Sequence, residues 1–307
     1  GDLGSAPLRI SEGVGGFPSG QLQCQNSNCK FGRSLASADL DGDGVPELLV
    51  GADTSGVNDR QDRGSSVFIL TFYDANNLTV RSWTRVREGT AGLVGATPTG
   101  FGISLAILQG SASGGVGTVL AVGAYSHDGL SMTLSGVVYL LKLASNLTVT
   151  SYQNVTSDQL GSSFSSGMQF GWNSLVALPD LNFDGFPELG AGRRPCRGLC
   201  VLAGNQADSG AVYVISLSPD TGSYVGNQMF LPDSALGVEP IDNFGSSLAV
   251  LTSQMSGVAQ HPHRLVVGAS TDNLGSDNLG SVWLILFIGE PAPPSSPPPP
   301  VTPPSPP

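Results

Sequence analysis

Short apolar runs, separated by turn-forming residues, make up most of this chain of 307 residues. In the first period three such runs follow one another at Ser34–Ala38, Glu47–Ala52 and Ser66–Thr71, and a more polar run follows at Leu78–Val86. Clusters of Gly, Asn, Asp and Ser lie between the runs, a pattern typical of β-strands and tight turns. No window keeps the period of an amphipathic helix. The pattern therefore predicts an all-β protein with four strands in each period.

Three short motifs mark each period and recur four times in the same order. A Phe-Gly pair opens the period, a Gly-Ala pair ends the second apolar run, and a single Gly precedes the third. The Phe-Gly pairs begin at Phe31, Phe101, Phe170 and Phe244 (70, 69 and 74 residues apart), the Gly-Ala pairs begin at Gly51, Gly123, Gly190 and Gly268, and the single glycines are Gly64, Gly136, Gly210 and Gly280. A fixed period indicates one unit that buries its apolar surface against copies of itself. We expect the glycines to allow positive φ angles or close approach, and the phenylalanines to fill the wedge between units.

Four antiparallel strands repeated in this way indicate a β-propeller, whose radial arrangement leaves only short sheet edges. An open stack, or two sandwiches with similar segments, is the alternative. The fourth unit has three strands and meets proline directly after Trp283–Ile288. The segments PLRIS and QLQCQ, which precede the first Phe-Gly pair, can supply the missing strand. We therefore expect a propeller of four blades over residues 1–289, closed by the N-terminal strand, with a fragment of a larger ring as the alternative.

The recurring Phe-Gly and Gly-Ala motifs resemble the FG-GAP repeat, the blade unit of integrin α-subunit propellers and related extracellular proteins. The resemblance covers residues 31–289 and implies a propeller, here of four units where integrin heads have seven. The third unit departs from the pattern, since GAGRRPCRGLC replaces the usual Gly-Ala-Pro type of ending. The sequence contains no RGD tripeptide, so the resemblance extends to the repeat and not to integrin ligand binding.

Two acidic loops of the same form, DLDGDGVPE and DLNFDGFPE, lie between the first and second strands of units one and three. Oxygens at positions 1, 3 and 5, a bend at the Gly in position 6 and a backbone carbonyl at position 7 can wrap a hard cation that takes six to eight oxygen ligands. FG-GAP blades carry a calcium site of this hairpin type, with a carboxylate at position 9 as here. The expected ligands are Asp39, Asp41, Asp43, the Val45 carbonyl and Glu47 in one loop, and Asp180, Asn182, Asp184, the Phe186 carbonyl and Glu188 in the other.

An EF-hand begins similarly but needs Glu at position 12 and flanking helices, whereas these loops have Val50 or Ala191 there and strands on both sides. An Asp-Gly turn without an ion is the alternative, and it would leave the carboxylates crowded and repelling one another. Units two and four carry LQGSASGGVGT and LTSQMSGVAQHPH at this place, without an acidic residue. We therefore expect two structural Ca²⁺ ions that pin alternate blades. Calcium that bridges to an acidic sugar or a partner is the other possibility.

Acidic residues outnumber basic residues by 24 to 13, which gives a net charge of −11. This balance argues against binding to nucleic acid or to anionic membranes. The one basic cluster, Arg193, Arg194 and Arg197, is typical of a solvated loop. No apolar stretch approaches the 18 residues of a membrane span, so we expect no membrane-spanning segment.

Four cysteines and three sequons indicate the compartment. Three disulfide connectivities are possible, and short loops favour Cys24–Cys29 and Cys196–Cys200; a zinc site would need distant blades to meet. Disulfides form in oxidising compartments, and N-glycosylation belongs to the same route. The expected acceptor sites are Asn77, Asn146 and Asn154. Together these features predict a secreted protein, here as a mature chain without its signal peptide.

From Pro291 the sequence reads PAPPSSPPPPVTPPSPP. Such a segment cannot form helix or sheet, and we expect a polyproline II tail over residues 290–307. The Ser-Pro₄ run resembles the extensin motif of hydroxyproline-rich glycoproteins in plant and green-algal walls. The resemblance implies hydroxylated, O-glycosylated prolines at Pro297, Pro298, Pro299 and Pro300. A proline-rich linker to a further domain is the alternative.

None of the three histidines, His127, His261 and His263, lies in a catalytic motif, so we do not expect an enzyme. The sequence favours a calcium-stabilised secreted glycoprotein, the structural or adhesive head of an extracellular matrix, cell-wall or surface-fibre assembly. Its partners would be copies of itself or other extracellular glycoproteins. A lectin-like propeller that binds wall polysaccharide between blades is the alternative, weakly disfavoured because Trp83 and Trp172 occupy different places in their units.

Overall fold

The computed structural model describes residues 8–22, 29–53, 65–74, 76–94, 100–110, 117–125, 135–161, 168–194, 210–231, 243–251, 263–270 and 279–287. These residues form an all-β protein of successive antiparallel sheets, as the periodicity predicts, with one short helix, α1 (Ser157–Leu160). The tail, Cys24, Cys196 and Cys200 lie outside the described residues.

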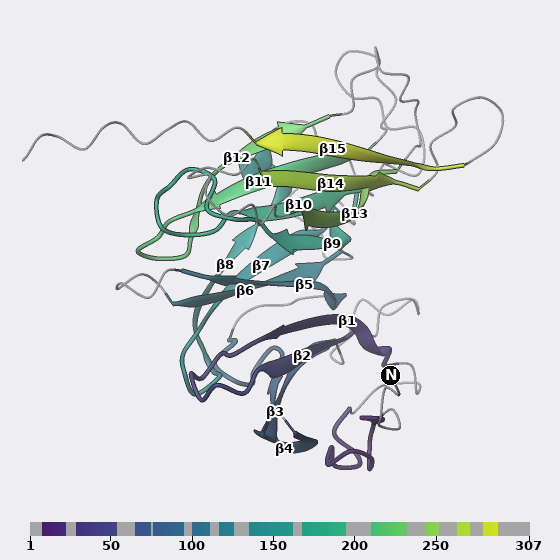
Figure 1. Cartoon of the computed structure of the whole chain (residues 1–307), viewed down its shortest axis with the longest axis vertical. Coiled ribbons are helices and arrows are strands. Elements are labelled where there is room, and N and C mark those ends of the chain that lie inside the picture. The colour runs from purple at the N-terminus through teal and green to yellow at the C-terminus, as the bar shows by residue number, and fades with distance from the viewer. Residues whose placement is uncertain are drawn as a thin grey trace, which may run out of the picture.

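Each period folds into one sheet, and we call the four sheets blades 1 to 4. Blade 1 contains β1 (Phe31–Ala38), β2 (Glu47–Ala52), β3 (Ser66–Asp74) and β4 (Asn77–Val86); blade 2 contains β5 (Phe101–Gln109), β6 (Thr118–Ala124), β7 (Val137–Leu143) and β8 (Val149–Val155). Blade 3 contains β9 (Phe170–Ala177), β10 (Leu189–Arg193), β11 (Ala211–Leu217) and β12 (Tyr224–Phe230), and blade 4 contains β13 (Phe244–Leu251), β14 (His263–Ala269) and β15 (Ser281–Phe287). Strands pair in chain order within every blade, and the blades follow one another from one end of the molecule to the other (Figure 1). This is the strand arrangement of propeller blades.

Neighbouring blades pack face to face around a phenylalanine. We call the side of a blade that carries this residue its rear face and the opposite side its forward face. Phe101, Phe170 and Phe244 are nearly or fully buried, each between its own blade and the preceding one. Each ring lies edge-on to an aromatic ring of the third strand of its own blade, as in Phe101 and Tyr139 at 5.6 Å. The expectation that phenylalanine fills the wedge is confirmed at these three junctions.

Glycines allow the inner strands of two blades to approach closely. A Cβ on Gly51 would lie 2.0 Å from the carbonyl oxygen of Gly102 in the next blade, so any side chain there would clash with the backbone. Gly102 itself has a φ of +89°, a conformation that favours glycine. Ser34 Oγ donates a hydrogen bond of 2.7 Å to the same carbonyl. Ser104 and Gly171 repeat this bond at the next junction, at 2.6 Å.

In blade 3 the glycine that faces the next blade is Gly192 and not Gly190. Arg193 pairs with Phe170, at the position that alanine holds in the other blades. A Cβ on Gly192 would lie 2.2 Å from the carbonyl oxygen of Gly245. The pair that occupies the Gly-Ala position in blade 3 is therefore Gly192-Arg193, two residues after the expected Gly190-Ala191. GAGR contains two similar pairs, and the motif alone cannot give the strand register.

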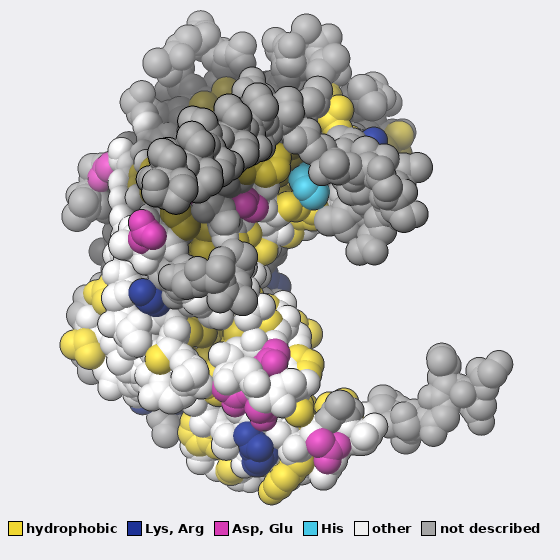
Figure 2. Space-filling model, turned by 60° about the vertical axis from the view of Figure 1, so that its left-hand side comes forward, with side chains coloured by type: hydrophobic (Ala, Val, Ile, Leu, Met, Phe, Trp, Pro, Cys, Tyr) yellow, Lys and Arg dark blue, Asp and Glu magenta, His cyan; other side chains and the backbone are white. Residues whose placement is uncertain are grey.

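The N-terminal segment does not close a ring. Residues 8–22 lie against the rear face of blade 1, where Phe17 stacks on Phe31 at 5.4 Å. The backbone N–H of Val80 in β4 donates to Gly15 O at 2.9 Å. No sheet is closed, and among the described residues blade 4 has three strands. The expectation that the N-terminal strand closes the ring is thus wrong. The segment instead covers the apolar surface on the open side of Phe31. Figure 2 shows the resulting arc, hollowed on one side.

Candidate metal centre

The loop between β1 and β2 folds around its own acidic side chains. Asp39 accepts hydrogen bonds from the N–H groups of Gly42 (2.8 Å) and Gly44 (3.0 Å), one to each carboxylate oxygen. Asp41 Oδ1 accepts from Asp43 N at 3.1 Å, and Asp43 Oδ1 from Val45 N at 2.8 Å. These bonds turn successive side chains toward the inside of the loop, where carboxylate oxygens of Asp39, Asp41 and Asp43 lie within 4.8 Å of one another.

The loop between β9 and β10 has the same construction. Asp180 accepts from Asp184 N (3.1 Å) and Gly185 N (2.8 Å), and Asp184 Oδ1 accepts from Phe186 N at 2.9 Å. Asn182 Oδ1 accepts from Asp184 N, and its Nδ2 donates to Asp184 Oδ2 at 2.9 Å. The hydrogen bonds donated by the backbone at positions 5, 6 and 7 to positions 3, 1 and 5 are therefore common to both loops, whereas Asp39 also accepts from position 4 and Asp180 from position 5.

Both loops turn at two residues with positive φ. The glycines at position 6, Gly44 and Gly185, have φ values of +84° and +92°, as the motif predicts. Position 4 also has positive φ: Gly42 at +83° in the first loop and Phe183 at +61° in the second. The left-handed region is uncommon for a phenylalanine. No residue of DLNFDGFPE predicts this second turn.

The glutamates at position 9 are the buried members of the two sites. Glu47 is 1% and Glu188 2% exposed, and their Oε2 atoms accept from Leu40 N (2.8 Å) and Leu181 N (2.6 Å). Burial raises the pKa of Glu47, and the nearby Asp41, Asp43 and Asp39 add to the shift. Burial likewise raises the pKa of Glu188 to about 7, with a further contribution from Asp180 and Asp184.

Glu188 carries the clearest sign of a missing ligand. Its Oε1 atom is buried and has no hydrogen-bond partner, which is costly for a carboxylate. A hard cation needs several oxygen donors, and in the first loop the carboxylate oxygens of Asp39, Asp41 and Asp43 converge. The residues therefore fit Ca²⁺. The participation of the Val45 and Phe186 carbonyls remains a prediction.

Two contacts near the first loop were not expected from the sequence. Arg81 Nη2 in β4 lies 3.8 Å from Asp43 Oδ2, with both side chains partly exposed. Gln109 Nε2, at the end of β5, donates to the carbonyl oxygen of Asp39 at 2.9 Å. The first contact is a weak surface ion pair, whereas the second ties the loop to the next blade. Neither residue belongs to a motif.

The remaining predicted sites are described in part. Cys29 is disulfide-bonded, and its pairing with Cys24 remains a prediction. Asn77 and Asn146 are exposed; Asn77 is the first residue of β4, the outer strand of blade 1, and Asn146 lies in the turn before β8, the outer strand of blade 2. Asn154 is half-buried in β8, and its Oδ1 is buried without a hydrogen-bond partner.

The prediction that the basic cluster is a solvated loop is wrong for its first residue, Arg193. Arg193 is fully buried and donates from Nη1 to the sulfur of Met168. The guanidinium of Arg194 lies over the ring of Trp172, 4.8 Å from its centroid. Arg193 is thus buried in β10, and Arg194 stacks on Trp172 of the neighbouring strand β9. Arg197 lies outside the described residues.

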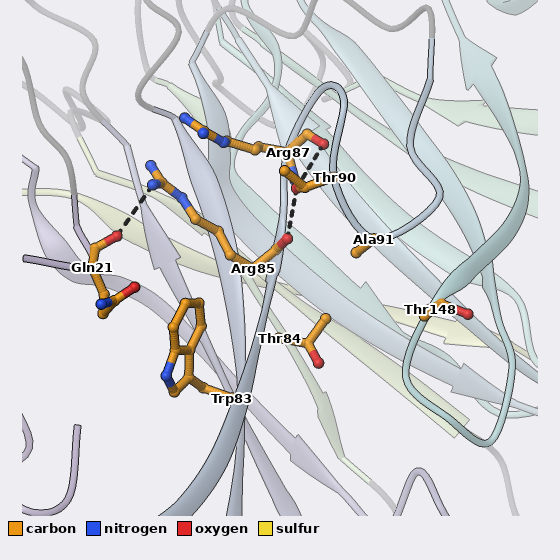
Figure 3. Close-up of a pocket in the computed structure, with 8 residues that line it drawn as sticks. All are labelled: Gln21, Trp83, Thr84, Arg85, Arg87, Thr90, Ala91 and Thr148. Atoms are coloured by element: carbon orange, nitrogen blue, oxygen red, sulfur yellow. Dashed lines mark hydrogen bonds between the residues drawn. The ribbon is translucent and has the colours of Figure 1, made fainter. Parts of the chain in front are cut away.

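A cavity of about 380 Å³ lies where the N-terminal segment meets the outer strand of blade 1 (Figure 3). Arg85 crosses it and donates to the carbonyl oxygen of Gln21 at 3.1 Å, while Thr90 Oγ1 donates to the Arg85 carbonyl at 2.7 Å. The lining residues are Gln21, Trp83, Thr84, Arg85, Arg87, Thr90, Ala91 and Thr148. Sequence reasoning placed no site here.

Comparison of the sequence with known proteins finds a similarity in the first blade. The search of curated proteins gave no match to this chain. Within the described residues, no helix has the length and apolar character needed to cross a membrane. The family model for the FG-GAP repeat matches residues 31–69, which cover β1, the first acidic loop, β2 and part of β3. The first blade and its acidic loop are therefore similar to the FG-GAP repeat, which occurs in integrin-like extracellular and adhesive proteins and is typical of proteins without enzymatic activity.

Proposed function

We propose that this chain is a calcium-stabilised, secreted glycoprotein module that serves as a structural or adhesive head in an extracellular matrix, cell wall or surface fibre. The observation that carries the proposal is the pair of acidic loops, each with a buried glutamate at position 9 and with aspartates that accept hydrogen bonds from the backbone of their own loop. The similarity of residues 31–69 to a repeat of extracellular proteins supports it. The disulfide at Cys29 and the exposed sequons agree with an oxidising compartment.

Calcium in this proposal is structural. Asp39, Asp41, Asp43 and Glu47 would hold one ion, and Asp180, Asn182, Asp184 and Glu188 the other. Each ion would neutralise carboxylates that now lie close together, and it would fix the connection between the two innermost strands of its blade. An ion that binds only the folded protein stabilises it by mass action.

Calorimetric titration of the calcium-free protein tests the metal sites. We expect two Ca²⁺ per chain, one lost in Asp41→Ala and the other in Asp184→Ala. Asp220→Ala, in an exposed turn of blade 3, is the matched control and should bind both ions. If calcium added to the unmodified protein produces no heat of binding, the loops are turns without ions.

Expression in a eukaryotic host tests secretion. The chain should appear in the medium, with glycans that an N-glycosidase removes.

The cavity near Arg85 favours one second candidate, binding of an acidic polysaccharide. Its wall carries an indole, Trp83, on which a sugar ring can stack, together with two guanidinium groups and three threonines. A glycan array probed with the calcium-loaded protein would decide between the two functions. Binding to one class of acidic sugar, lost in Arg87→Ala, would favour the lectin; an array without signal would leave the structural role.

A further inference from the structure

Blade 4 exposes the face that the other three blades bury. Its forward face carries Leu251, Val266, Val282, Leu284 and Leu286 on three adjacent strands, with the exposed Arg264 between Leu251 and Leu286. Val282 is 70% and Leu284 61% exposed, and Leu251 and Leu286 are each 49% exposed. Adjacent apolar side chains on one sheet face, exposed to this degree, are characteristic of an interaction site.

Strand register shows that this face is equivalent to buried ones. Val266 pairs with Leu284 in blade 4 as Leu49 pairs with Ile69 in blade 1. Ile69 is fully buried against the rear face of blade 2. Leu140, at the same position in blade 2, is 2% exposed and lies against blade 3. The forward face of blade 4 thus has the composition of a junction that lacks its second half.

Blade 1 carries the second half. Its rear face is the only one among the described blades with no blade in front of it, and Leu35 in β1 is 62% exposed there. Leu105, the equivalent residue of blade 2, is 7% exposed because blade 1 covers it. Phe17 stacks on Phe31, at the start of the innermost strand, and lies edge-on to Phe68, but Leu35, further along that strand, stays exposed.

The serine donor and the glycine acceptor of a junction are also present, on blade 4 and blade 1 respectively. Ser34 and Ser104 each donate to the glycine carbonyl of the next blade. Ser247 holds the same position in blade 4, next to Gly268, which corresponds to Gly51. On blade 1 the corresponding glycine is Gly32, which has a φ of +93°, and apart from its chain neighbours no atom of the described residues lies within 4 Å of the place where a Cβ would lie. The described residues therefore leave space for the partner here.

We infer that the forward face of blade 4 binds the rear face of blade 1 of a second copy of this chain, and that residues 8–22 compete for that rear face. The contact repeats the three junctions already present in the molecule, with the Phe31 wedge placed against Val282 and Leu284. Two forward faces cannot make this junction with each other, because neither carries the phenylalanine. A head-to-tail contact of this kind produces rings or filaments. The inference deepens the proposed function by naming the partner, and it rests on that assembling role.

Two charge substitutions at exposed positions separate the halves of the junction. Leu284→Asp disables the forward face of blade 4, and Leu35→Asp disables the rear face of blade 1. Sedimentation of the full chain over a concentration series should show self-association of the unmodified protein, weakened by about tenfold or more in either variant. An equimolar mixture of the two variants should recover association as far as a dimer, because each retains the half that the other lacks. Val225→Asp, at a 66% exposed position in β12, is the control and should behave as the unmodified protein.

Phe17→Ser tests the competing segment. Loss of the buried ring should release residues 8–22 and strengthen self-association by about tenfold, and Leu284→Asp in the same chain should abolish the gain. A Leu35→Asp chain that associates as well as the unmodified protein would show a symmetric contact and overturn the inference. So would an unmodified protein and a Phe17→Ser variant that both stay monomeric. Calcium titration of the Leu284→Asp chain keeps the two questions apart, since it should still bind two ions if only the docking inference fails.

Discussion

The side-chain amide of Gln109 donates a 2.9 Å hydrogen bond to the backbone carbonyl of Asp39, a residue that begins the acidic loop of the preceding blade. On the other side of the same turn, a Cβ on Gly110 would lie 2.8 Å from the ring of Phe186, in the acidic loop of blade 3. Blade 2 has no acidic loop of its own, yet the end of β5 touches both loops. The two proposed ions thus flank one strand end.

This arrangement predicts that calcium orders a blade that binds none. Removal of the ion should increase hydrogen exchange at the end of β5, near Leu108 and Gln109, as well as within the loops. Gln109→Ala should reduce that coupling to the first loop while leaving calcium stoichiometry unchanged. Exchange in β12, which lies away from both loops in the sheet order, serves as the internal reference. Equal protection of β5 with and without calcium would contradict the prediction.

Chelation should lower the melting temperature of the whole module. At calcium concentrations 100-fold above the dissociation constant, each ion contributes about 2.7 kcal/mol to the free energy of unfolding. For a domain of this size, two such ions correspond to a shift on the order of 10 °C. Asp41→Ala should lose about half of the shift and Asp220→Ala none of it. A melting curve that is the same in calcium and in chelator would contradict the prediction.

The fold was readable from the sequence where local patterns decide it. Glu47–Ala52 was predicted to the residue, because a buried strand bounded by an acidic loop and a Gly-Ala pair has clear ends. The ligand types and the turn at position 6 also follow from spacing alone. The position of Arg193, the rear-face location of Phe17 and the contact of Gln109 depend on which surfaces are left open once the blades stack. Such relations join residues that are distant in sequence, and no local motif encodes them.

The calcium-free protein should become less stable as the pH rises from 4.5 to 7. Burial raises the pKa of Glu188 to about 7 from an ordinary value of 4.5, so the folded state binds this proton more tightly than the unfolded state. The stabilisation is fully present below about pH 4.5 and is lost as the pH rises through about 7. Melting in chelator across this range measures the effect. Glu188→Gln removes the titrating group and should flatten the profile, while an equally steep profile in that variant would assign the dependence to other groups.

Glycan occupancy should follow exposure. Asn77 and Asn146 are exposed, one at the start of β4 and the other in the turn before β8, so an enzyme can reach their side chains. Asn154 pairs with Tyr139 inside the sheet and has its side-chain oxygen buried. Intact mass of the chain recovered from the medium of a eukaryotic host should therefore show two N-glycans, one lost in Asn77→Gln and one in Asn146→Gln. Asn154→Gln should leave the glycan mass unchanged, and a loss in that variant would show that the sequon is used before β8 folds.

The close approach of Gly51 to the next blade makes it sensitive to any added side chain. In Gly51→Ala the new methyl group would lie 2.0 Å from the carbonyl oxygen of Gly102 and 2.2 Å from Ser34 Oγ, so blades 1 and 2 must separate or lose the serine hydrogen bond. We expect a loss of about 3 kcal/mol or more, as for other overpacked interiors. Gly226→Ala, in β12, is the matched control, because no atom of the described residues apart from its chain neighbours lies within 4 Å of the added Cβ and its backbone has no positive φ. Denaturant unfolding of the two variants measures the difference in stability. Equal stabilities would mean that this contact does not hold the blades together. The docking inference, which assumes such a close-packed junction, would then have to be abandoned.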